Sequence, residues 1–177
     1  MSERACRRVP NVLLAAAISA VALPAAAFAQ CPKARADRPL FVAGGRYDAP
    51  LQGAATGGIL IPLWDLEYGD AGCSAPAYRG LQVEATAGRG GARLAAGLAR
   101  RTREDGHPSL FGQDVLVSVM RTGASPREAD AHATYLGIEA GLTVLGVRLG
   151  LGVAHRLTSA GTKATVFTWS AGVQIGW

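Results

Sequence analysis

The chain has 177 residues, a formal net charge of +5 and only 6% aromatic residues. This charge is small and forms no basic block with interleaved aromatics, which argues against nucleic-acid binding. The length allows one domain with a filled core, even after an N-terminal segment is removed.

Residues 1–29 have the organisation of a secretory signal peptide. Three arginines precede an apolar run over 12–23, and Ala27-Phe28-Ala29 forms a small-x-small cleavage site before Gln30. The apolar run is shorter than the roughly 18 residues that a membrane-spanning helix needs. We therefore expect export and cleavage after Ala29.

Two cysteines, Cys31 and Cys73, remain after cleavage. In an oxidising periplasm such a pair is typical of a disulfide, although two unpaired thiols would have the same sequence. The residues before Cys31 lack the leucine and the small residue usual before a lipidated cysteine. No CxxC motif or His/Cys cluster has zinc-ligand spacing, so neither a metal nor another cofactor is expected.

Alternation of apolar and polar residues with a period of two predicts about eight strands in the remaining chain. The predicted strands cover 39–47, 54–64, 79–88, 92–102, 112–121, 132–145, 147–157 and 163–177. Arg89-Gly90-Gly91 predicts a hairpin turn rather than a phosphate-binding loop, because no helix or Walker lysine follows. A helix over 135–154 is disfavoured, because five glycines within it would each cost ~1 kcal/mol.

One face of these strands is almost purely aliphatic, while the other carries small, polar and charged residues. The charged set on this second face is Glu84, Arg93, Asp114, Glu139 and Arg148. Inside a closed eight-stranded barrel these residues would pair with one another and fill a narrow interior. Two interpretations remain: a salt-bridge plug that holds the barrel shut, and a gated polar path or small ligand site.

The last strand, from Trp169 to Trp177, alternates in the same way and ends on an aromatic residue. Gly172, Ile175 and Trp177 resemble the C-terminal signature of bacterial outer-membrane β-barrels, a segment read by the barrel-assembly machinery in that family. The chain as a whole resembles the small eight-stranded outer-membrane barrels of Gram-negative bacteria, of the opacity-protein and OmpX kind. The resemblance implies an all-β fold, an antiparallel up-and-down closed barrel that contacts outer-membrane lipid.

On this basis we divide the chain into a signal peptide (1–29), an N-terminal periplasmic segment (30–38) and a barrel domain (39–177). With an even number of strands, the loops at 65–78 and 103–111 lie on the same side as both chain ends. Aromatic residues near the strand ends predict a sparse girdle at the membrane boundaries. They are Phe41, Tyr47, Trp64, Tyr78, Phe111, Tyr135, Phe167, Trp169 and Trp177.

The sequence predicts a non-enzymatic outer-membrane barrel with a structural or adhesive role. One alternative is a soluble periplasmic barrel that binds a small apolar ligand. Another is an envelope hydrolase using His155, because residues 155–161 resemble a stretch of the lipid A deacylases. Ser159, however, stands four residues from His155 instead of two, and no asparagine precedes Ala160. The sequence predicts no oligomeric state.

Overall fold

The computed structural model describes residues 38–64, 67–68, 76–102, 109, 111–158 and 161–177. The predicted signal peptide, Cys31 and Cys73 lie outside these residues. The described strands are β1 (Leu40–Ala49), β2 (Gln52–Pro62), β3 (Glu67–Tyr68), β4 (Pro76–Gly88), β5 (Gly91–Thr102), β6 (Phe111–Thr122), β7 (Thr134–Val144), β8 (Val147–Arg156) and β9 (Thr165–Gly176).

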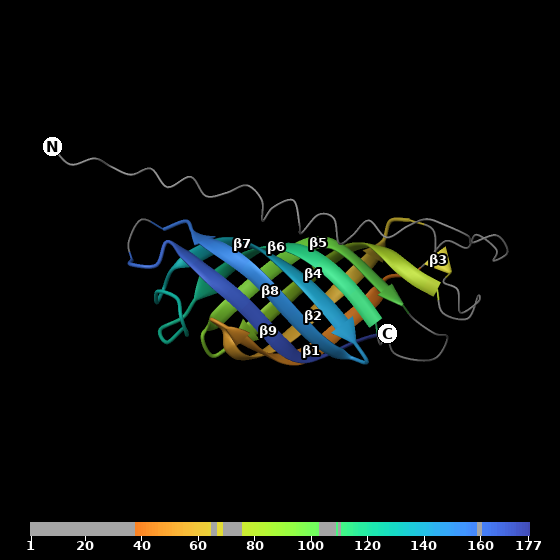
Figure 1. Ribbon diagram of the computed structural model, residues 1–177, viewed down its shortest axis with the longest axis horizontal. Helices are drawn as coiled ribbons and strands as arrows, with labels where there is room; N and C mark the ends of the chain where they lie inside the picture. The colour runs from red at the N-terminus through yellow and green to blue at the C-terminus, as the bar shows by residue number, and fades with distance from the viewer. Residues whose placement is uncertain (1–37, 65–66, 69–75, 103–108, 110, 159–160) are drawn as a thin grey trace.

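The eight long strands form a closed antiparallel barrel, as the alternation predicts (Figure 1). The sheet order is β2-β1-β9-β8-β7-β6-β5-β4-β3, and the additional pairing of β2 with β4 closes the ring. The two-residue β3 was not predicted; it extends the sheet beside the first residues of β4. Ring closure gives every long strand two neighbours and leaves no long strand with an open edge.

The two ends of the barrel differ in their connections. We call the end that carries Leu40 and Trp177 the terminal rim, and the opposite end the distal rim; they lie on the right and left of Figure 1. The distal rim carries two tight turns, at 50–51 and 89–90, and the longer connections at 123–133 and 157–164. β2 and β5 end, and β4 and β6 begin, at the terminal rim, as expected from the even strand number.

The tight turns follow from local sequence. Leu145 and Gly146 join β7 to β8, and both have positive φ, at 51° and 79°. Paired positive φ values give a turn whose twist matches that of the flanking strands, and the glycine adopts this conformation without steric cost. The first turn is shorter than the predicted 48–53, because β1 continues through Asp48 and Ala49.

The strands point aliphatic side chains outward and polar ones into the middle of the barrel. The exposed aliphatic residues include Leu94, Leu98, Val117, Val119, Leu136, Ile138, Leu142, Val147, Leu149, Leu151, Val153, Val173 and Ile175. The buried polar residues include Gln82, Thr86, Ser118, Thr143, Thr168, Ser170 and Gln174, together with the charged residues described below. The neighbouring residues Arg148 and Leu149 show this sidedness directly: Leu149 is exposed and Arg148 is buried. A soluble barrel with an apolar interior would have the opposite arrangement.

The interior is apolar at both ends, contrary to the expectation of a uniformly polar inner face. At the distal rim, Leu51 packs inside with Met120, Tyr135 and Val166. At the terminal rim, Leu40 and Leu60 form a second buried cluster, against which Tyr78 packs. The prediction of Tyr78 and Tyr135 as girdle residues was therefore wrong. Both take inward positions of their strands and pack with the buried apolar clusters at the two rims.

Candidate functional site: an ion-pair cluster inside the barrel

Eight charged side chains from six strands meet in the middle of the barrel. The five predicted members all lie there: Glu84 on β4, Arg93 on β5, Asp114 on β6, Glu139 on β7 and Arg148 on β8. Three others lie with them, namely Arg46 and Asp48 on β1 and Arg101 on β5. The set holds four arginines and four carboxylates, so its formal charge is zero. We call it the interior cluster.

Arg148 organises the half of the interior cluster nearer the terminal rim. Its guanidinium contacts both carboxylate oxygens of Asp114, with Nη2–Oδ1 at 2.6 Å and Nε–Oδ2 at 3.3 Å. Its Nη1 also donates to Glu139 Oε1 at 2.8 Å and to Ser170 Oγ at 3.2 Å. Such a two-pronged contact between planar groups is the strongest form of a side-chain ion pair. Arg148 thereby ties β6, β7 and β9 together across the interior.

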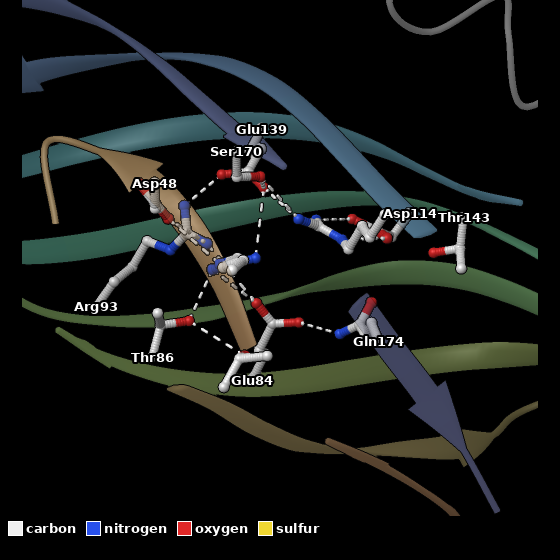
Figure 2. Close-up of polar contacts among 12 residues, drawn as sticks. Asp48, Glu84, Thr86, Arg93, Asp114, Glu139, Thr143, Ser170 and Gln174 are labelled. Carbon is white, nitrogen blue, oxygen red and sulfur yellow. Dashed lines mark hydrogen bonds and ion pairs between the residues drawn. The ribbon is translucent and has the colours of Figure 1, made fainter. Parts of the chain in front are cut away.

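Arg101 belongs to the same half but is held mainly by neutral groups. Its Nη2 donates to Gln174 Oε1 at 2.8 Å and its Nη1 donates to Thr143 Oγ1 at 3.1 Å. Asp114 Oδ2 lies 3.6 Å from Nη2. Gln174 in turn donates to Glu84 at 3.0 Å, which links this half to the other one (Figure 2).

Arg46 and Arg93 form the half nearer the distal rim. Arg46 Nη2 lies 3.1 Å from Glu84 Oε1 and donates to Thr86 Oγ1 at 2.7 Å. Asp48 Oδ2 lies 3.3 Å from both guanidinium groups. Arg93 also pairs with Glu139, so this carboxylate bridges the two halves. The cluster thus runs continuously across the barrel, as Figure 2 shows.

Glycines on the inner face leave room for these long side chains. Gly172 stands opposite Arg46 on one side and Arg148 on the other. A Cβ atom at this position would press on the backbone and the side chain of Arg46. Gly172, predicted as part of an assembly signal, therefore also makes space for the interior cluster. Ile175 on the same strand and Trp177 directly after it are exposed.

A second polar network fixes the connections at the distal rim. Asp130 Oδ2 accepts hydrogen bonds from Arg156 Nη1 at 2.6 Å and from the Lys163 backbone amide at 2.9 Å. Its Oδ1 accepts from Thr162 Oγ1 at 3.0 Å. The Tyr135 hydroxyl accepts from the Asp130 amide at 3.0 Å. Asp130 thus joins the connection at 123–133 to the one at 157–164.

This network predicts a local acid response. The Lys163 amide, with Thr162 and Arg156, holds the pKa of Asp130 at about 2, below its ordinary value of 3.8. A lowered pKa means that the ionised carboxylate stabilises the fold fully above about pH 4, and that this contribution is lost as the pH falls through about 2. The NMR shift of the Lys163 amide in micelles should titrate with a midpoint near about 2. Asp130→Asn should abolish the titration, and a midpoint at the ordinary value of 3.8 would contradict the assignment.

His155 has one polar contact among the described residues: its Nδ1 lies 3.1 Å from Thr165 Oγ1 on the neighbouring strand. Both side chains are exposed, and no third group orients the imidazole as a catalytic base requires. Ser159 lies outside the described residues. The geometry therefore adds no support to a hydrolase.

The described residues contain no group of three or more His, Cys, Asp or Glu side chains placed to hold a metal ion. Each carboxylate of the interior cluster faces guanidinium groups instead. Within the same residues, no helix is long and apolar enough to cross a membrane. No family model, curated protein or solved structure matches this chain.

Proposed function

We propose that this protein spans the outer membrane of a Gram-negative bacterium as a small, plugged β-barrel of the opacity-protein and OmpX kind, with a structural or adhesive role. The observation that carries the proposal is the sidedness of the barrel. Acidic and basic side chains are buried together at its centre, while leucines, isoleucines and valines cover its outside. In water this arrangement would expose far more contiguous apolar surface than the roughly 300–600 Å² patch of a typical soluble monomer.

The dimensions of the outer surface fit a bilayer. The long strands contain 10 to 13 residues. At the usual rise and tilt, ten residues give a height of roughly 25 Å, close to the apolar band of known transmembrane barrels. Exposed aromatic side chains lie near both ends of this band. They are Phe41, Trp64, Phe111 and Trp177 at the terminal rim and Tyr47 and Phe167 toward the distal rim.

The interior favours a plug over an open channel. Arg46, Arg93 and Arg148 each reach carboxylates on strands other than their own, so their side chains cross the lumen. Buried apolar clusters also lie inside the barrel near both of its ends. A soluble barrel that binds an apolar ligand would need an apolar centre, but this centre holds the eight acidic and basic side chains of the interior cluster. We therefore place the role of the molecule on its outer surfaces and propose no catalysis.

We also propose that the barrel-assembly machinery recognises the last strand. Ile175 and Trp177 are exposed, so they are open to a partner before lipid covers them. The same strand closes the ring by pairing with β1, from Val42–Gly176 to Ala49–Trp169. Binding of the machinery to β9 would keep this edge strand from pairing with other chains until β1 is available to close the ring.

Fractionation of cells that express the full chain tests the membrane proposal. We expect the protein in the outer-membrane fraction, extracted only by detergent. The unboiled sample should also migrate differently from the boiled sample on a gel, because the closed barrel resists the detergent at room temperature. Recovery in the soluble periplasm without detergent would contradict the proposal and favour the soluble barrel.

A further inference from the structure

The outer wall of the barrel has a groove near the distal rim, with a volume of about 660 Å³. It crosses β2, β4, β5 and β6. Small outward residues, among them Ala55, Gly57, Ala85, Ala87 and Ala92, form its floor. On the β7–β9 side, by contrast, the outer wall carries leucine, isoleucine, valine and aromatic side chains. The groove is therefore a depression lined by small residues, in an outer wall that elsewhere carries large apolar side chains.

One edge of the groove combines apolar and cationic groups. Leu94 and Val119 stand beside the small residues, and Arg121 lies next to them at the distal end of β6. Arg121 is exposed, and its Nη1 donates a hydrogen bond to Thr134 Oγ1 at 3.0 Å. Arg89 is also exposed, in the two-residue turn that joins Ala87 to Ala92 through Gly88 and Gly91. Neither arginine has an ion pair within the described part of the chain.

We propose that this groove binds one acyl chain of a phospholipid with a net negative charge, with the lipid phosphate on Arg121. The inference rests on the proposed membrane location. The floor and Leu94 would contact the acyl chain, and the planar guanidinium would donate paired hydrogen bonds to phosphate oxygens at headgroup level. An occupant with an apolar tail and an anionic head matches both parts of the groove.

The charges disfavour a second copy of the chain as the occupant. Two copies in one membrane, related by an axis along the membrane normal, would present the same surface patch to each other. Arg89 and Arg121 would then meet the equivalent arginines of the partner at the same depth, and like charges across an interface are costly. An anionic lipid neutralises these charges instead.

Native mass spectrometry of the full chain folded in detergent tests the proposal, with dioleoyl phosphatidylglycerol as the probe. The comparison lipid is dioleoyl phosphatidylcholine, which has the same chains without net charge, and glycerol 3-phosphate tests a free anion. The wild type should retain phosphatidylglycerol in preference to both. Arg121→Gln should weaken this retention about tenfold, the usual effect of losing a charge-assisted bond, while Arg121→Lys should restore part of it.

Matched variants separate the two halves of the groove. Ala85→Leu fills the floor and should weaken retention of both lipids, whereas Ala140→Leu, the same change at an exposed position of β7, should not. Lys163→Gln removes one positive charge from the distal rim away from the groove and should leave retention unchanged. A folded state of each variant is verified by its gel mobility without boiling.

Three results would overturn the inference. Equal phosphatidylglycerol retention by Arg121→Gln, Ala85→Leu and the wild type would show that the groove is not a lipid site. Equal affinity for glycerol 3-phosphate would show that the acyl chain adds nothing. A wild-type dimer that Ala85→Leu dissociates would make a second copy the occupant. Each of these results differs from the result expected if the membrane proposal fails, because the protein would then be soluble without detergent.

Discussion

Leu151→Arg is expected to destabilise the barrel in lipid vesicles by about 2–4 kcal/mol, the usual cost of a cation at the bilayer midplane on a barrel's lipid face. Leu151 lies halfway along β8 and is 72% exposed. In water, an exposed arginine at the same position would be nearly neutral in its effect. Urea unfolding in vesicles, followed by tryptophan fluorescence, measures the change.

Leu157→Arg supplies the control at another depth. Leu157 is 59% exposed and lies just beyond the end of β8 at the distal rim. The same substitution there should cost about 0–1 kcal/mol, because the arginine reaches headgroups and water. Similar small effects at both positions would mean that the aliphatic belt does not face lipid, and the membrane proposal would fail.

Arg148→Met is expected to lower the free energy of unfolding by about 3–5 kcal/mol, because removing one partner leaves buried charges uncompensated. Asp114 would lose its two-pronged partner, and Glu139 would keep Arg93 and the more distant Arg46. Methionine retains much of the side-chain volume, so most of the loss should come from charge rather than from a cavity. The same unfolding assay measures it.

Two further variants separate burial from simple loss of an arginine. Arg127→Met removes an exposed ion pair with Glu128 and should change stability by about 0–1 kcal/mol. The double variant Arg148→Met, Asp114→Asn restores formal neutrality in the interior cluster and should recover part of the stability. No recovery in the double variant would show that charge balance does not control the stability of this interior.

The strands and their two faces could be predicted from the sequence because alternation is a local signal, whereas the closed barrel was implied by the resemblance of the chain to outer-membrane barrels. Each long strand lies within a few residues of its predicted range, and Arg89-Gly90 forms the predicted turn between β4 and β5. The alternation also fixes sidedness once one face is assigned, since a strand reverses its faces every residue. The strand count then fixes which connections share a rim.

The incomplete list of interior charges has two physical causes. Asp48 falls just after the first predicted strand, 39–47, whereas β1 continues to Ala49. Arg46 follows Leu40 and Val42 on the same inner row, and those apolar residues concealed a polar interior position. Arg101 could have been found, because it shares phase with Arg93 along β5.

The apolar clusters inside both rims could not be predicted from the alternation of apolar and polar residues. A two-class pattern assigns apolar residues to one face only, whereas Leu51, Met120 and Tyr135 lie on the inner face near the distal rim. Their packing depends on which residues of different strands meet inside the closed barrel and on the turn that places Leu51 in the interior. That information arises from the three-dimensional closure of the ring, which no local window contains.

The pairing of β1 with β9 has a consequence for the order in which the strands can follow one another along the chain. Phe41 and Trp177 exchange backbone hydrogen bonds at 3.0 and 2.9 Å, so residues from opposite ends of the described sequence are immediate neighbours. Once folded, this junction is bonded like every other pair of adjacent strands. The barrel therefore has no strand that must come first in the sequence. A circularly permuted chain, with new ends at Leu145-Gly146 and a linker that joins the segments before β1 and after β9, would keep the same pairs of neighbouring strands.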